Sequence, residues 1–156
     1  MLYNSDKTMG TAESCTGGRI AEAIISVPGA SNYFKGGIVS YTNEVKERLL
    51  GVSHEVLEEQ TAVCEEVARE MVVGAIKALD VDFAISATGV AGPTGGTKEI
   101  PVGTIYIGYG NKDDVRVEKL TEDYGRDINL AIATNTALKG MLDFLKEHAE
   151  ELKKEA

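Results

Sequence analysis

Residues 11–18 read TAESCTGG, and this segment decides how we interpret the rest of the chain. It carries one carboxylate and, after it, two hydroxyls and one thiol, followed by two glycines and by a helical pattern over residues 18–27. A nucleophilic side chain at the start of a helix faces the positive end of the helix dipole, and glycines let the backbone approach a ligand closely. The pattern therefore indicates a catalytic or ligand-binding turn. Alternatively, Ser14 or Thr16 caps the helix and the glycines only form the turn.

The composition is that of a globular domain with a core of its own. The chain has 156 residues, of which 43% are hydrophobic and 26% are charged. No apolar run reaches the roughly 18 residues of a membrane helix, and the N-terminus lacks a signal-peptide core. We therefore expect one domain over residues 1–156 in the cytoplasm, away from membranes, with a charged tail from about residue 148. The net charge of −9 argues against nucleic-acid binding, although a local pocket can still hold a small anionic substrate.

Cysteine and histidine are scarce. Cys15 and Cys64 have neither metal-ligand spacing nor the pattern of a disulfide framework. His54 precedes a helical pattern and His148 lies in the charged tail, so neither is close in sequence to a candidate nucleophile. A lysine is therefore the better candidate for a general base.

Hydrophobic periodicity predicts an alternation of strands and helices. The predicted strands cover residues 7–12, 37–42, 81–87, 101–109 and 115–120, and the predicted helices cover residues 18–27, 44–50, 53–60, 64–79 and 126–144. We expect Asn43 to cap the second helix, and Ile128 and Leu142 to lie on the buried face of the last one. Because the last two strands read as a hairpin, we predict a three-layer α/β/α domain with a mixed sheet of about five strands.

Three polar segments each follow a predicted strand. Besides residues 11–18, they are residues 40–46 (SYTNEVK) and residues 86–96 (SATGVAGPTGG). Because ligands bind at the carboxyl ends of strands in such sheets, we expect the three segments to form one site. Lys46 would lie in the first turn of its helix, where a cation opposes the dipole, or it is simply solvated. The glycine-rich loop offers backbone amides to a ligand, or it is only a long mobile connection.

The motifs TAESCTGG, GGIVSYTNEVK, LGV, ISATGVAGPTGG and PVGTIYIG, in this order and spacing, resemble the CinA C-terminal domain family. The resemblance covers about residues 11–127, and the enzymes of this family are nicotinamide-nucleotide amidohydrolases. It implies a three-layer α/β fold with a mixed sheet. It also implies hydrolysis of the carboxamide of nicotinamide mononucleotide to nicotinic acid mononucleotide and ammonia, in pyridine nucleotide salvage, without a metal or another cofactor.

The resemblance also implies roles for the residues at the motif positions. Ser14 would be the nucleophile, Lys46 its base, and Tyr41 would position the pair or relay a proton. A lysine can act as a base only if burial or neighbouring cations lower its pKa. The residues expected to hold the substrate or orient the catalytic pair are Thr16, Gly17, Gly18, Asn43, Thr88, Gly89, Gly92 and Arg126. The backbone amides of either glycine segment can serve the oxyanion or the phosphate, and the sequence leaves open which does which.

The sequence departs from the family pattern at both ends. Only ten residues precede Thr11, where family members have an extra helix, so we expect a partly uncovered sheet face that a partner subunit closes in a homo-oligomer. At the start of the last helix Arg126 is kept, but Leu130 stands where a second arginine is usual. Cys64 and Ile100 also stand where serine and lysine are usual. A catalytically weakened nucleotide-binding module is therefore the alternative function, and an amidase that uses the Cys15 thiol is a third.

Overall fold

The computed structural model describes residues 1–153, and one mixed sheet of five strands lies at its centre. The strands are β1 (Met9–Glu13), β2 (Phe34–Val39), β3 (Phe83–Gly89), β4 (Ile105–Gly110) and β5 (Val115–Leu120). Their spatial order is β2-β1-β3-β4-β5. β1 runs parallel to β2 and β3, whereas β4 is antiparallel to β3 and β5. The predicted mixed sheet, with its terminal hairpin, is confirmed.

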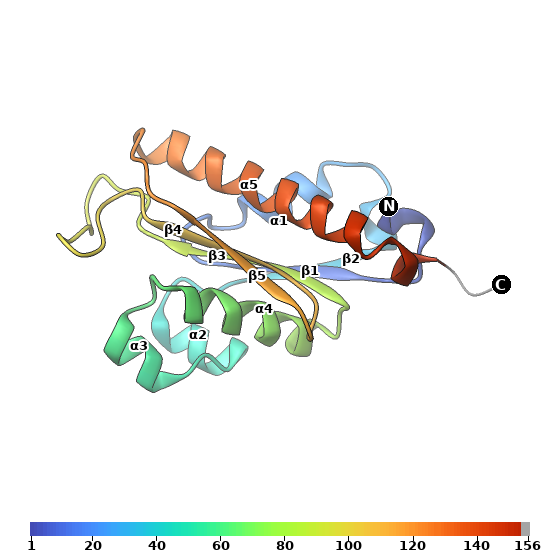
Figure 1. Cartoon of the computed structure of the whole chain (residues 1–156), viewed down its shortest axis with the longest axis horizontal. Coiled ribbons are helices and arrows are strands. Elements are labelled where there is room, and N and C mark those ends of the chain that lie inside the picture. The colour runs from blue at the N-terminus through green and yellow to red at the C-terminus, as the bar shows by residue number, and fades with distance from the viewer. Residues whose placement is uncertain (154–156) are drawn as a thin grey trace.

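Helices cover both faces of this sheet (Figure 1). α1 (Arg19–Ile25) and α5 (Arg126–Glu147) lie on one face, and α2 (Asn43–Leu50), α3 (His54–Gln60) and α4 (Glu65–Leu79) lie on the other. Because both faces are covered, every residue of β1 is buried, including its polar ones. The predicted three-layer α/β/α arrangement is confirmed. The long connection between β3 and β4, yellow in Figure 1, extends beyond one end of the sheet.

Several predicted boundaries are wrong by a few residues. β2 begins at Phe34 because its glycines pair with β1: Gly36 lies opposite Gly10, and Gly37 opposite Thr11. The pattern had placed these glycines outside the strand or at its edge. The cap of α2 was also assigned to the wrong residue, because the hydroxyl of Thr42, one position earlier, accepts a hydrogen bond from the amide of Val45 at 3.3 Å.

The buried face of α5 differs from the predicted one. Ile128 and Leu142 are exposed, and the helix packs on the sheet through a neighbouring stripe that includes Leu130, Ala133 and Ala137. The small side chains of this stripe allow the helix to approach the sheet closely. Periodicity of large apolar residues was therefore wrong for Ile128 and Leu142, although Met141 and Leu145, which it also placed in the core, are buried.

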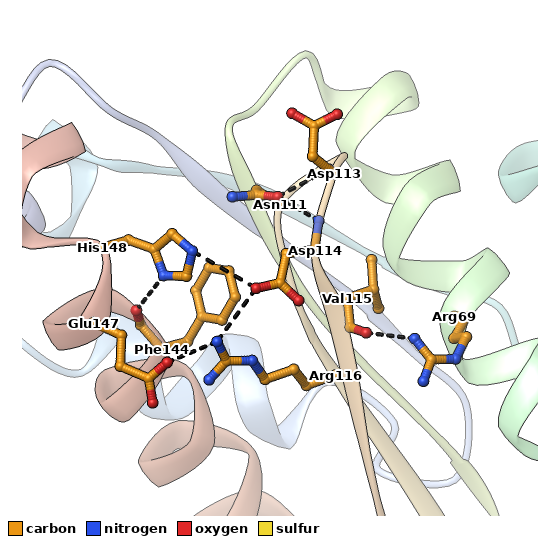
Figure 2. Close-up of polar contacts among 9 residues, drawn as sticks. All are labelled: Arg69, Asn111, Asp113, Asp114, Val115, Arg116, Phe144, Glu147 and His148. Carbon is orange, nitrogen blue, oxygen red and sulfur yellow. Dashed lines mark hydrogen bonds and ion pairs between the residues drawn. The ribbon is translucent and has the colours of Figure 1, made fainter.

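The beginning of β5 is attached to both helical layers (Figure 2). The guanidinium group of Arg69 in α4 donates a hydrogen bond to the carbonyl of Val115. The guanidinium group of Arg116 contacts the carboxylate of Glu147 in α5 at 2.7 Å and lies 4.9 Å from the centre of the Phe144 ring. An exposed ion pair contributes little by itself. The start of β5 is therefore held by the ion pair, the hydrogen bond from Arg69 and the contact with the Phe144 ring together.

The described part of the predicted tail packs onto the same end of the molecule. The imidazole of His148 stacks on Phe144 with 4.0 Å between ring centres, and Leu152, in the short helix Ala149–Leu152, is buried. Residues 154–156 of that tail lie outside the described residues.

An apolar groove of about 500 Å³ lies between the N-terminal turn, α1 and α5. Its lining includes Met1, Leu2, Tyr3, Ile24, Leu138 and Met141. α1 and α5 lie over the same face of the sheet (Figure 1). The predicted partner subunit in a homo-oligomer stays a prediction.

Close contact between α2 and α4 depends on Gly74. A Cβ atom at this position would lie 2.0 Å from the carbonyl oxygen of Leu50 at the end of α2. Since α2 carries Lys46, the position of that side chain depends on how closely the two helices pack.

Gly74→Ala tests this packing. Alanine normally stabilises a helix by about 1 kcal/mol relative to glycine, but overpacking typically costs about 1–3 kcal/mol. We expect a net decrease in the free energy of unfolding, measured by urea denaturation. Val73→Ala, at the adjacent exposed position, is the control and should stay within about 0.5 kcal/mol. A more stable Gly74→Ala protein would contradict the packing argument.

Candidate active site

The turn after β1 places Ser14 at the carboxyl end of the strand. The turn needs two residues with left-handed backbone, Gly17 with φ of 57° and Gly18 with φ of 103°, before α1 begins. Neither candidate hydroxyl caps α1, so the capping alternative is wrong. Instead, the carboxylate of Glu13 accepts hydrogen bonds from the amides in the first turn of the helix.

The amine of Lys46 lies directly beside the hydroxyl of Ser14. The Lys46 Nζ atom is 2.9 Å from Ser14 Oγ, 2.7 Å from the carbonyl oxygen of Ser40 and 3.3 Å from that of Tyr41. The residue is 1% exposed, so the alternative of a solvated lysine is wrong. All three acceptors are uncharged oxygens.

Burial gives this lysine the properties of a base. Removal of the ammonium group from water lowers the pKa of Lys46 from 10.5 to about 8. About a tenth of the molecules therefore carry a neutral amine at pH 7, and about half do at pH 8. When the amine is neutral, the same contact allows the Ser14 hydroxyl to donate to it, as general-base catalysis requires.

The neighbouring thiol has the opposite property. Burial raises the pKa of Cys15 from 9.0 to about 11, so the thiol stays protonated near neutral pH. Because the thiolate is the reactive form, this environment disfavours the hypothesis of a Cys15 thiol amidase.

The serine and lysine open onto a cleft of about 390 Å³ at the carboxyl ends of the parallel strands. The predicted site residues that line it are Ser14, Tyr41, Asn43, Lys46, Thr88, Gly89, Gly92 and Arg126. All three polar segments therefore meet in one cleft, as expected from their positions at the carboxyl ends of strands. Ala62 and Val63, from the connection between α3 and α4, also line it and were missed, because small apolar residues before a helix carry no functional signal.

The cleft is electropositive although the chain is acidic. Among the described residues that line it, none carries a carboxylate, whereas Lys46 and Arg126 are cationic residues. The overall net charge is −9. Such a cleft can attract a small anion that the rest of the surface would repel.

Several predicted site residues make contacts that define their positions. Thr88 donates through its hydroxyl to the carbonyl of Ala62 at 2.8 Å, and Arg126 donates to the carbonyl of Gly92 at 2.7 Å. Tyr41 lies at the rim with 67% of its surface exposed, and its main-chain carbonyl is the group that contacts Lys46.

Three predicted residues of the first segment lie outside the cleft lining. Thr16 is fully buried and donates its hydroxyl to Glu13, while Gly17 and Gly18 form the turn.

Leu130, at the position of the second family arginine, is fully buried in the core. This position therefore packs against the sheet and does not face the cleft.

The described part of the chain offers neither a metal site nor a membrane span. In residues 1–153, no cluster of three or more His, Cys, Asp or Glu side chains could hold a metal ion. None of the helices in this range is both long and apolar enough to cross a membrane.

Together, fold and site define a class of protein: a three-layer α/β domain with a serine and a buried lysine at the carboxyl ends of its parallel strands. The family model for the CinA C-terminal domain matches residues 1–145. The chain therefore belongs to the CinA C-terminal domain family, which confirms the resemblance seen in the motifs.

Curated relatives and solved structures agree with this membership. A CinA-like protein of Leptospira borgpetersenii is 45% identical over 150 residues, which are 96% of this chain and 36% of the relative. A putative competence-damage inducible protein of Clostridium kluyveri is 44% identical over 88% of this chain and 34% of its own length. The chain thus spans about a third of these relatives. A crystal structure of a CinA superfamily protein from Escherichia coli matches with a TM-score of 0.86 and 35% identity, covering 90% of this chain and 82% of the other.

The buried amine of Lys46 should leave a signature in the pH dependence of stability. Its pKa is lowered in the folded state, so between pH 8 and 10.5 the unfolded chain binds more protons, and the free energy of unfolding rises with pH. Relative to Lys46→Met, the wild type should gain up to about 3 kcal/mol across this window, measured by urea denaturation at several pH values.

The control for this comparison is Lys77→Met, which removes an exposed lysine from α4 and provides the baseline for loss of one surface charge. A stability difference between wild type and Lys46→Met that stays constant with pH would show that burial does not perturb the amine.

Proposed function

We propose that this protein hydrolyses the carboxamide of nicotinamide mononucleotide to nicotinic acid mononucleotide and ammonia. The observation that carries the proposal is the 2.9 Å contact between Lys46 Nζ and Ser14 Oγ, made by a buried amine in a cleft. Membership of the CinA C-terminal domain family supports the choice of reaction. The electropositive cleft supports an anionic substrate.

The reaction begins when Ser14 Oγ forms a bond to the carboxamide carbon and the neutral amine of Lys46 takes the hydroxyl proton. The resulting ammonium gives this proton to the amide nitrogen, the C–N bond breaks, and ammonia leaves an ester on Ser14. In the second half, Lys46 takes a proton from a water molecule that attacks the ester carbon. The lysine then returns the proton to Ser14 Oγ as the acid is released.

Other residues at the cleft bind the substrate in this proposal. Gly89 and Gly92 line the cleft and Gly17 and Gly18 do not, so we assign the stabilisation of the oxyanion to backbone amides of the loop after β3. Arg126 binds the phosphate group, while Asn43 and Thr88 contact the rest of the substrate. Tyr41 covers the reacting group at the rim.

The proposal also concerns the cellular setting. The reaction would return the product of pyridine nucleotide breakdown to synthesis in the cytoplasm, and the apolar groove between α1 and α5 is consistent with a homo-oligomer.

Ser14→Ala should lower the rate of ammonia release from nicotinamide mononucleotide by at least about 10³-fold, because the nucleophile is lost.

The rate of the intact chain should rise with pH up to about 8, as Lys46 loses its proton. Cys15→Ser should keep the rate, since the thiol is protonated. If the folded wild type is stabilised by the nucleotide in a thermal-shift assay but releases no ammonia, the chain is a nucleotide-binding module and the enzyme proposal is wrong.

Arg126→Ala should raise KM for nicotinamide mononucleotide by about 10–100-fold, because charge-assisted hydrogen bonds to the phosphate contribute about 1.5–3 kcal/mol. Nicotinamide riboside, which lacks the phosphate, should be hydrolysed by both proteins with similar KM. Lys139→Ala removes an exposed cation from the same helix and is the control. An equal increase in KM for both substrates would contradict a phosphate contact.

A further inference from the structure

One buried carboxylate next to the site has no part in the proposed chemistry. Glu13 is 1% exposed, and its Oε1 atom accepts hydrogen bonds from the hydroxyl of Thr16 at 2.7 Å and the amide of Ile20 at 2.9 Å. Its Oε2 atom accepts from the amide of Ala21 at 3.0 Å and, at 3.5 Å, from the hydroxyl of Thr11. All four partners are donors, which is what an acceptor-only carboxylate requires when it is buried.

These contacts span the turn that contains Ser14. An ordinary helix cap comes from the residue just before the helix, but Gly18 at that position offers no side chain. Here the cap comes from the end of β1, on the other side of the turn. The turn begins at Glu13 and ends at the helix amides that bind the Glu13 carboxylate, so both of its ends are fixed to the same residue. The hydroxyl of Thr16 connects the middle of the turn to this carboxylate as well.

The main chain of Glu13 also belongs to a ring of contacts around the serine–lysine pair. Its carbonyl accepts a hydrogen bond from the amide of Ser40 at 2.7 Å, and the carbonyl of Ser40 accepts from Lys46 Nζ at 2.7 Å. Lys46 Nζ contacts Ser14 Oγ, and the peptide bond between Ser14 and Glu13 closes the ring. A shift of Glu13 therefore changes the position of the nucleophile relative to its base.

We infer that Glu13, held by Thr16, is a positioning residue that sets the geometry between Ser14 Oγ and Lys46 Nζ. It acts through those two residues and makes no contact with the substrate, because it is buried behind the turn. The inference rests on the proposed function. It also explains how a carboxylate can be buried at the start of the Ser14 turn: its oxygens are occupied by four donors, and the lysine amine keeps only uncharged partners.

A positioning role and a purely structural role predict different kinetics. If the Glu13 contacts only stabilise the fold, their loss lowers stability and leaves the rate constants of the folded protein unchanged. If they position the nucleophile, kcat falls while KM is kept, because a misplacement of about 1 Å can lower a rate by about 10²-fold.

Thr16→Val tests the inference, since valine keeps the shape of threonine and removes the donor to Glu13. We expect kcat for ammonia release to fall by about 10-fold or more, with KM within about twofold. The rate at which a fluorophosphonate labels Ser14 should fall in parallel, and this readout does not depend on the identity of the substrate. Thr16→Ser, which restores the donor, should recover most of both rates.

Two further variants complete the experiment. Thr134→Val removes a hydroxyl that bonds to the carbonyl of Leu130 in α5, far along the chain from the turn, and should leave both rates unchanged. Glu13→Gln replaces one acceptor oxygen by a donor that opposes the donors around it, so its kcat should fall further, by about 100-fold. Urea denaturation confirms that each variant is folded under assay conditions.

The outcomes separate this inference from the proposed function. A folded Thr16→Val protein with wild-type kcat and labelling rate overturns the positioning role and leaves the proposed function intact. A loss that Thr16→Ser does not recover also overturns it. If Ser14 is labelled in the wild type but no ammonia is released, the proposed substrate is wrong, and the labelling rates still decide the role of Glu13. A wild type that shows neither reaction overturns both.

Discussion

The site depends on one constraint: the amine of Lys46 is removed from water without a carboxylate partner. Charged groups in a protein interior are normally paired, since desolvation disfavours the charged form. Here the amine contacts only a hydroxyl and two carbonyls, so no charged partner offsets its desolvation and its pKa is lowered to about 8. A solvated lysine, or one paired with an acid, would remain protonated near neutral pH and could not take a proton from serine.

This arrangement opposes stability, so the surrounding structure must enforce it. α2 carries the lysine, and its position is set at one end by the Thr42 cap and at the other by close packing of Leu50 on Gly74. On the opposite side, β1 is buried between two helical layers and fixes the start of the Ser14 turn. The carboxyl ends of three parallel strands bring these elements together. The rigidity of the sheet is therefore what holds a lysine where its charged form is disfavoured.

The sequence predicted the architecture more fully than the contacts of single residues. Alternating strand and helix patterns, with a terminal hairpin, were enough for the three layers and the mixed sheet. The proximity of Ser14 and Lys46 could be predicted from the motifs and from the rule that ligands bind at the carboxyl ends of strands. The burial of Lys46 could not be predicted, because α2 alone reads as an ordinary amphipathic helix. Thr16 was expected to hold the substrate or to orient the catalytic pair, and its hydroxyl points to Glu13. Side-chain direction in a tight turn depends on backbone angles at Gly17 and Gly18, which periodicity does not reveal.

The cleft satisfies two electrostatic requirements in the same way. A carboxylate on its wall would pair with Lys46 and raise the pKa of the amine, and it would also repel an anionic ligand from Arg126. The described lining contains no such group, although acidic residues outnumber basic ones in the whole chain by 25 to 16. The carboxylate next to Ser14 in sequence, that of Glu13, is turned toward the amides of α1 and the hydroxyls of two threonines. The described residues that line the cleft therefore carry no carboxylate, and the carboxylate of Glu13 behind it is occupied by hydrogen bonds. A carboxylate in the cleft would oppose both the deprotonation of Lys46 and the binding of an anion.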